Sequence, residues 1–298
     1  MSIRIAVTGK HGQVVRALVE AGPALGIEVI TAGRPELDLA VPETVQPVLT
    51  AAEPDLVVNA ASYTAVDKAE QEPEQANAVN ATGAGAVAAA ACVLGVPLIH
   101  LSTDYVFDGS KPTPYVEEDP VTPCNVYGAS KLAGEQAIAV ATPNHVILRT
   151  AWVYSPFGKN FVRTMLALAQ SRNEVRVVAD QHGCPTYAPD IAVAIVAIAQ
   201  NLLNKPDDHQ LRGLFHLAGS EETSWADFAA AIFDSVAANG MHKPLVIPIP
   251  SVDYPTAAYR PKNSRLDCSK LERLHGVQLP SWRASLTTCL KHLTSEFP

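Results

Sequence analysis

Apolar runs alternate with helix-compatible segments along the first half of the chain. The apolar runs are short and partly β-branched, as strands are, and lie at residues 3–7, 28–32, 55–61, 96–103 and 145–150. The segments between them have helix-forming composition, most clearly the alanine-rich stretch 77–94. Strands that alternate with helices at this spacing predict a Rossmann-like α/β fold with a doubly wound parallel sheet.

The pattern is looser after residue 150. It predicts further strands at 175–178 and 213–218, and a helix that begins after Ser224, whose hydroxyl can cap it. Residues 244–261 hold too many prolines for a helix, and amphipathic helices are predicted near the C-terminus.

Two lobes are expected from this change of pattern. We expect residues 1–150 to form the sheet lobe and to take back about 174–188 and 213–238. The remainder of 151–298 would form a smaller α/β lobe, with the ligand held in the cleft between the two lobes.

Composition excludes some classes of function. The 298 residues carry a formal net charge of −8 at a pI near 5.6, which argues against binding to nucleic acid. There is no run of ~18 apolar residues and no signal-peptide pattern at the start, so we expect no membrane contact. The five cysteines are scattered without metal-site spacing, which favours reduced thiols, a cytoplasmic protein and no metal site.

A glycine loop follows the first strand. Gly9 and Gly12 allow the chain to turn tightly and to approach a pyrophosphate, which the next helix N-terminus attracts. The third small residue of such a loop would stand at position 15, where the chain has Val15. A loop of this kind alone also occurs where a strand is simply joined to a helix.

The end of the second strand bears on cofactor choice. An acidic residue there would hold the ribose hydroxyls of NAD, and none is present. Arg34 stands there instead, followed by Asp38 and Leu39, and can pair with a 2′-phosphate or be a solvated turn residue. The pattern favours NADPH, with NADH as a second cofactor. The small residues after Asn59 leave room for a cofactor across the sheet.

Three polar residues predict carbonyl chemistry. Thr103 ends one predicted strand, and Tyr127 and Lys131 are four residues apart on the next predicted helix, so they share one face. A cation beside a phenol lowers its pKa, and such a tyrosine can protonate a carbonyl oxygen that Thr103 also contacts. A surface tyrosine beside a lysine gives the same spacing by chance.

In combination, these motifs resemble the extended short-chain dehydrogenase/reductase superfamily and, more narrowly, the dTDP-4-dehydrorhamnose reductase family. The segments that carry the resemblance span nearly the whole chain: 8–14 (TGKHGQV), 59–70 (NAASYTAVDKAE), 101–109 (LSTDYVFDG), 127–135, 149–154, 160–162, 180–186 and 260–266.

The resemblance implies NADPH-dependent reduction of the C4 ketone of a dTDP-4-dehydro-6-deoxy-L-sugar, with Thr103, Tyr127 and Lys131 as catalytic residues. It implies cofactor contacts from Gly9, Lys10, His11, Gly12, Gln13, Val14, Arg34, Asp38, Leu39, Asn59, Ala60, Ala61, Ser62, Tyr63, Asn80, Ser102, Tyr127 and Lys131. It implies contacts with the nucleotide sugar from Thr64, Val66, Thr103, Asp104, Tyr105, Trp152 and Arg260. Trp152 could instead be a core residue, and Arg260 a structural ion-pair partner.

The resemblance has departures and alternatives. Some family members dimerise through Mg²⁺ held by glutamates, and the matching position on the first helix is Ala17, with Glu20 one turn later. We therefore expect no Mg²⁺ site, and a monomer or a different homodimer. The alternatives are a reductase for another dTDP-4-keto-deoxysugar, such as a streptose precursor, and a non-catalytic subunit like the regulatory β subunit of methionine adenosyltransferase.

Overall fold

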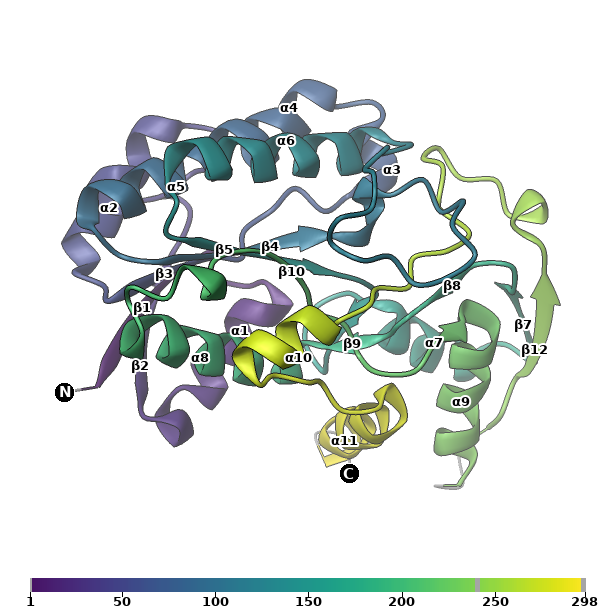
Figure 1. Cartoon of the computed structure of the whole chain (residues 1–298). Helices are drawn as coiled ribbons and strands as arrows, with labels where there is room; N and C mark the ends of the chain where they lie inside the picture. The colour runs from purple at the N-terminus through teal and green to yellow at the C-terminus, as the bar shows by residue number, and fades with distance from the viewer. Residues whose placement is uncertain (1, 239–241, 296–298) are drawn as a thin grey trace.

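The large sheet is parallel throughout, as predicted. The computed structural model describes residues 2–238 and 242–295. Within them, six strands pair in the order β10-β5-β4-β3-β1-β2 (Figure 1). The strands are β1 (Ile3–Thr8), β2 (Ile27–Ala32), β3 (Leu56–Asn59), β4 (Leu98–Thr103), β5 (His145–Thr150) and β10 (Gly213–His216). The order reverses between β1 and β3, which places the ligand crevice at their carboxyl ends.

Helices cover both faces of this sheet (Figure 1). The helices α2 (Val45–Ala52), α5 (Gly83–Leu94) and α6 (Val126–Ala141) lie on one face, and α1 (Gln13–Ala21), α8 (Ala188–Asn204) and α10 (Ser269–His275) on the other. Side chains of a strand alternate between the two cores: Ile5 and Val7 pack toward α1 and α8, whereas Ala6 packs toward α2 and α5. This alternation buries both faces and confirms the α/β class.

A second core lies beyond the sheet. The strand β7 (Glu174–Val178) pairs in parallel with β12 (Leu245–Ile249), and α7 (Phe161–Ala169), α9 (Trp225–Ala237) and α11 (Trp282–Ser295) pack around them. Short pairs complete this region: β6 (Val153–Tyr154) with β9 (Thr186–Tyr187), and β8 (His182–Gly183) with β11 (Thr223–Ser224).

Two segments expected in the sheet lobe lie elsewhere, and one strand was missed. The strand at 174–178 does not join the large sheet, because β10 already occupies the edge beside β5 and because Val175 and Val177 pack into the second core. The proline-rich stretch contains β12, which was not predicted; Pro248 fits because β12 has a partner on one side only. Ser224 caps α9 as predicted, but α9 packs in the second core.

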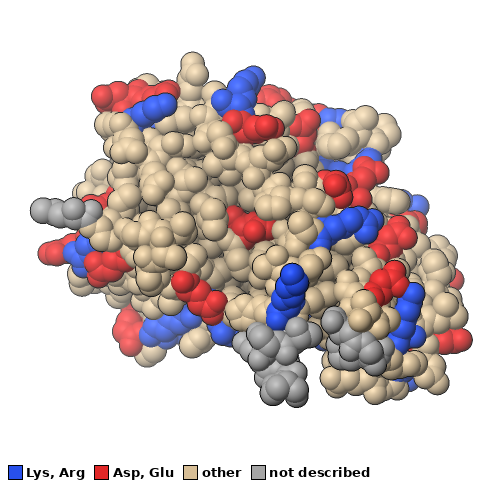
Figure 2. Space-filling view, turned by 90° about the horizontal axis from the view of Figure 1, so that it is seen from below, with Lys and Arg blue, Asp and Glu red and all other residues tan. Residues whose placement is uncertain are grey.

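One helical segment is long and apolar. The helices α4 (Pro73–Asn77), η3 (Ala78–Thr82) and α5 run continuously over Pro73–Leu94, which by length and composition alone would suffice to cross a membrane. Such a segment is also typical of core helices, and here Val87 and Ala88 are fully buried against the sheet. The helix α6 crosses it so closely that a Cβ on Gly134 would lie 2.1 Å from the Asn80 carbonyl oxygen. On the face shown in Figure 2, acidic and basic side chains are interspersed.

Candidate active site

A cavity of about 810 Å³ opens at the carboxyl ends of the central strands. It brings together most of the predicted cofactor residues: Gly9, Lys10, His11, Gly12, Gln13, Val14, Arg34, Asp38, Leu39, Ala60, Ala61, Ser62, Tyr63, Ser102, Tyr127 and Lys131. Lining residues that the sequence reasoning missed are Val15, Gly33, Leu37, Lys68, Glu72, Gln75, Val79, Leu101, Thr150, Val153, Gly158 and Lys159.

The glycine loop forms one end of the cavity. Gly9 has a φ of +97°, which favours glycine, and its N–H donates to the Ala32 carbonyl at 2.7 Å. Gly12 precedes α1, whose first turn has neither a side-chain cap nor an acidic residue. The N–H groups at the start of α1 are therefore oriented to receive an anion. Val15 is buried and lies 3.4 Å from where a Cβ of Gly9 would stand, so it fills the space that the glycines leave.

Two cationic residues line the cavity beyond the end of β2. Arg34 follows β2, is exposed and lines the cavity. Lys10 lies beside it and pairs with Glu36, Nζ to Oε2 at 2.6 Å. Because Ala32 ends the strand, there is no carboxylate at the position where NAD-selective sites have one.

Two residues that we predicted to contact the cofactor lie behind the cavity wall. Asn59 is buried beneath it and bonds to Thr8 and His100. The Asn80 side chain accepts from the Ser62 hydroxyl and the Tyr63 N–H, both at 2.8 Å. Both asparagines brace the lining loops instead of lining the cavity, because their short amide side chains are fully used within the fold.

Tyr127 and Lys131 meet at the cavity as their spacing predicts. Asn125 caps α6 by accepting from the Gly128 N–H at 2.7 Å, and this sets the first turn beside η4 (Asp104–Val106). Lys131 is buried, and its Nζ donates to the Leu101 carbonyl at 2.6 Å. Burial lowers the pKa of Lys131 to about 8.

The pKa of Tyr127 differs from our expectation. Burial raises it to about 12, and a side-chain hydrogen bond with Thr103 offsets only part of that rise. We expected Lys131 to lower it, but the Lys131 amine is directed to the Leu101 carbonyl and His100. In this state, Tyr127 therefore holds its proton throughout the neutral range.

A buried ion pair supports the floor of the site. Arg149 donates to both carboxylate oxygens of Glu135, at 3.0 and 2.7 Å, and the Ser102 hydroxyl donates to the same carboxylate. The pair is almost inaccessible to solvent. It fixes Ser102 against α6 and was not predicted, because nothing in the sequence pairs an arginine on a strand with a glutamate on a helix.

Asp104 is buried directly behind Thr103. Thr103 Oγ1 donates to Asp104 Oδ1 at 3.0 Å, while Oδ2 has no hydrogen-bond partner among the described residues. Burial raises the pKa of Asp104 to about 7. The Thr103 hydroxyl is thus directed to the carboxylate, and a protonated Asp104 would be able to donate to Thr103 instead.

The predicted sugar contacts are only partly gathered at the cavity. Thr64 lines it, whereas Val66, Thr103, Asp104, Tyr105, Trp152 and Arg260 do not. Trp152 stacks on Trp225, with ring centroids 3.5 Å apart, and its Nε1 donates to Ser264. Because Trp225 covers one face of Trp152, only its other face or its edge is left for a ligand. Arg260 forms an ion pair with Asp67.

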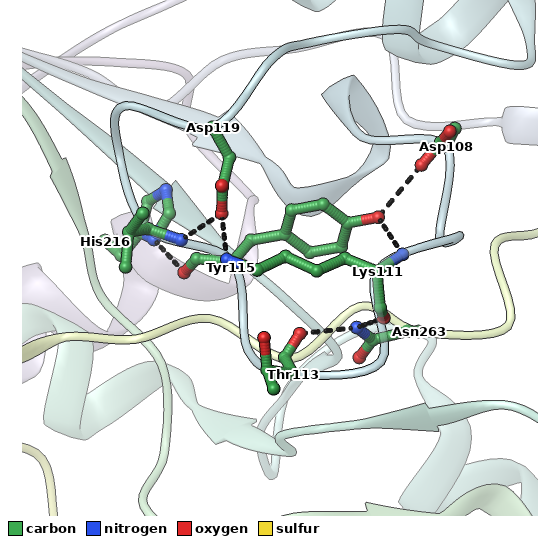
Figure 3. Close-up of polar contacts among 8 residues, drawn as sticks. Asp108, Lys111, Thr113, Tyr115, Asp119, His216 and Asn263 are labelled. Carbon is green, nitrogen blue, oxygen red and sulfur yellow. Dashed lines mark hydrogen bonds and ion pairs between the residues drawn. The ribbon is translucent and has the colours of Figure 1, made fainter.

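The loop after η4 is held against the second half of the chain (Figure 3). The Tyr115 hydroxyl donates to Asp108 at 2.9 Å and accepts from the Lys111 N–H, and the Tyr115 carbonyl lies 3.1 Å from His216 Nδ1. Asn263 donates to the carbonyls of Lys111 and Thr113. These contacts fix the segment that follows Thr103 and Asp104.

Comparison with known proteins decides the family. The model of the RmlD substrate binding domain matches residues 3–295. A dTDP-4-dehydrorhamnose reductase from Sinorhizobium fredii is 54% identical over 284 residues, 95% of each chain. The chain belongs to the dTDP-4-dehydrorhamnose reductase family.

Other members agree in sequence and structure. The Escherichia coli dTDP-4-dehydrorhamnose reductase is 42% identical over 98% of each chain. A crystal structure of the Bacillus anthracis enzyme, in complex with NADP, is 37% identical and superposes with a TM-score of 0.89, covering 98% of this chain and 100% of that one. The predicted family, its oxidoreductase class and the Rossmann-like fold are confirmed.

Proposed function

We propose that this protein reduces the C4 ketone of dTDP-4-dehydro-6-deoxy-L-mannose (dTDP-4-dehydro-β-L-rhamnose) to dTDP-L-rhamnose, using NADPH. The observation that carries the proposal is that Tyr127 and Lys131 line the same cavity as the glycine loop. The family's name gives the substrate class, and the NADP in the B. anthracis structure gives the cofactor class.

The residues of the cavity fit a dinucleotide. Gly9 and Gly12 have no side chains to block a pyrophosphate, and Val15 packs beside both of them. The uncapped start of α1 offers N–H groups to the pyrophosphate. Arg34 and Lys10 provide cations for a 2′-phosphate. When bound, the reduced nicotinamide supplies the hydride for the ketone carbon.

The protein's own part in the reaction is to hold and donate a proton. Tyr127 is protonated at neutral pH and gives its proton to the ketone oxygen as negative charge develops there. Thr103 orients the same oxygen, and Asp104, when protonated, releases the Thr103 hydroxyl for this contact. Lys131 is buried behind Tyr127, which itself lines the cavity where the ketone would be held.

For the nucleotide sugar we propose direct contacts from Thr64, Val66, Thr103, Asp104, Tyr105 and Trp152, with Arg260 acting mainly through its ion pair with Asp67. Thr64 and Val66 lie on the loop that Asp67 ties to Arg260. The free face or edge of Trp152 would pack on the deoxysugar, since aromatic rings pack well on apolar sugar faces.

The partners are proposed as a small-molecule nucleotide sugar and, at most, a second copy of the chain. Ala17, which stands where some relatives have a metal-binding glutamate, is buried between α1 and α8, and Glu20 lies 4.0 Å from Arg16. The described residues contain no group of three or more His, Cys, Asp or Glu side chains suited to a metal ion. Monomer or homodimer, and a cytoplasmic location, stay predictions.

The test is loss of NADPH absorbance when the purified protein meets enzymatically generated dTDP-4-dehydro-6-deoxy-L-mannose, with dTDP-L-rhamnose identified as product. Tyr127→Phe should bind NADPH as the wild type does and lose turnover by ~10²–10⁴-fold, the usual contribution of a general acid. Turnover that survives in Tyr127→Phe would reject Tyr127 as the donor. Cofactor binding without oxidation would favour another keto-sugar or the non-catalytic subunit.

A further inference from the structure

A buried chain of hydrogen bonds leads from the first strand to Lys131. Thr8 Oγ1 lies 2.6 Å from Asn59 Oδ1, Asn59 Nδ2 lies 3.0 Å from His100 Nδ1, and His100 Nε2 lies 3.1 Å from Lys131 Nζ. Thr8, Asn59, His100 and Lys131 are all nearly inaccessible to solvent. The proton positions in such a chain follow from which atoms can only donate and which can only accept.

Thr8 determines the orientation of the Asn59 amide. Thr8 Oγ1 accepts from the N–H groups of Ala60 and Ala61, at 3.1 and 3.0 Å, so its single proton points to Asn59 Oδ1. The opposite amide orientation would aim Nδ2 at an oxygen that already accepts two N–H groups. It would also leave the Thr8 proton without an acceptor, which is costly in a buried site.

The orientation of Asn59 in turn determines the tautomer of His100. Because Asn59 Nδ2 donates to Nδ1, the imidazole carries its proton on Nε2. His100 is neutral, since burial lowers its pKa well below the usual range. Its Nε2–H therefore points at Lys131 Nζ, where only a lone pair can accept it.

The surroundings of Lys131 do not favour an ammonium. Glu135 lies one turn along α6 and raises the pKa of Lys131 to some extent, but both of its oxygens are taken by Arg149 and Ser102. The neighbouring Tyr127 phenol is neutral. An ammonium here would be buried without a direct carboxylate partner, which is unfavourable.

We propose that His100 is a positioning residue that presents Nε2–H to Lys131 and so shifts Lys131 toward the neutral amine in the cofactor-free protein. Thr8 and Asn59 impose this state from a distance, although neither touches Lys131. The inference deepens the proposed reductase function and rests on it only for the catalytic consequence. That consequence is that Lys131 gives up its charge near pH 8, below the ordinary lysine value of ~10.4, so that Tyr127 has no neighbouring cation above that pH.

The first test is direct titration of Lys131. Protein labelled with ¹³C at the lysine Cε is titrated by NMR, and the Lys131 signal is assigned by its loss in Lys131→Arg. We expect a midpoint near 8, as burial implies. A wild-type midpoint near ~10.4, the ordinary lysine value, would overturn the proposal without any variant.

Variants distinguish the effect of the hydrogen-bond chain on the Lys131 midpoint from the effect of burial. In His100→Gln the amide oxygen can accept from an ammonium, so the Lys131 midpoint should rise by about one unit, a tenfold change. Thr8→Val frees the Asn59 amide to turn, so it should also raise the midpoint, whereas Thr8→Ser should not. His145→Gln alters a nearby histidine that bonds to the Thr142 carbonyl and should leave Lys131 unchanged.

If His100→Gln and Thr8→Val both left the midpoint at the wild-type value, the hydrogen-bond chain through His100 would not influence the protonation of Lys131. The basic limb of the pH profile of kcat/KM should shift with the NMR midpoint. The two measurements test separate hypotheses. Absence of turnover would count against the proposed reaction, whereas the NMR titration of Lys131 does not depend on turnover.

Discussion

Arg260 and Asp67 form a two-point ion pair across 193 positions of the chain. Arg260 Nη2 lies 2.7 Å from Asp67 Oδ2, and Nη1 donates to Oδ1 at 3.1 Å. The pair lowers the pKa of Asp67 and joins the loop that begins at Thr64 to the C-terminal segment. Both terminal nitrogens of Arg260 thus already donate to Asp67.

We expect the ion pair to affect substrate binding through this loop. Asp67→Asn and Arg260→Gln should each raise KM for the nucleotide sugar by about 3–10-fold, and the double variant should be no worse, because residues in contact couple non-additively. Steady-state kinetics check this, with Arg176→Gln in the exposed pair with Asp253 as control. A much larger effect of Arg260→Gln alone would show direct contact with the substrate.

Arg34 should determine the preference for NADPH. It is exposed at the cavity, with no ion pair among the described residues. Arg34→Gln should raise KM for NADPH by about tenfold, equivalent to ~1.4 kcal/mol of lost charge-assisted hydrogen bonding, and leave KM for NADH unchanged. Parallel assays with the two cofactors measure this, with the surface substitution Arg273→Gln as control. Equal losses with both cofactors would place Arg34 elsewhere than at the 2′-phosphate.

The sequence predicted the sheet because its strands are buried on both faces and therefore consist of nearly continuous apolar residues. It predicted Tyr127 and Lys131 because a four-residue spacing becomes a shared face on any helix. It could not predict β12, since prolines there argue against regular structure, or the place of β7, since strand pairing depends on distant segments. His100 lies in an apolar strand, where nothing in the pattern reveals a partner from α6.

Asp104 should make the protein less stable at high pH. Its pKa is about 7 in the folded state, above the unfolded value of 3.8, so the folded state binds the proton more tightly. The stabilisation is complete below pH 4 and is lost as the pH rises toward 7. Between pH 5 and pH 8 the wild type should lose roughly 2–3 kcal/mol from this group, and Asp104→Asn should not.

Urea unfolding at the two pH values measures the effect of Asp104. The comparison of interest is the difference in unfolding free energy between pH 5 and pH 8 for each protein, which cancels any change in packing caused by the substitution. An equal pH dependence in Asp104→Asn and wild type would mean that the Asp104 carboxylate is not destabilised by burial.

His216 should make the protein less stable at acid pH, which is opposite to the effect of Asp104. Burial and the nearby Arg149 lower its pKa to about 3, from 6.5 when unfolded, so the unfolded state binds the proton more tightly. Stability from this group is complete above pH 6.5 and is lost as the pH falls through that value toward 3. At pH 5 the loss should be roughly 2 kcal/mol relative to pH 7.

A variant without the imidazole isolates this contribution. His216→Phe gives up the contact of Nδ1 with the Tyr115 carbonyl and should be less stable at pH 7, but it should lose less stability between pH 7 and pH 5. His209→Gln, an exposed histidine, is the control and should keep the wild-type pH dependence. An unchanged pH dependence in His216→Phe would mean that acid unfolding is driven by other groups. Because His216 holds the segment that follows Asp104, acid should release that segment early, which hydrogen exchange at residues 107–121 would detect.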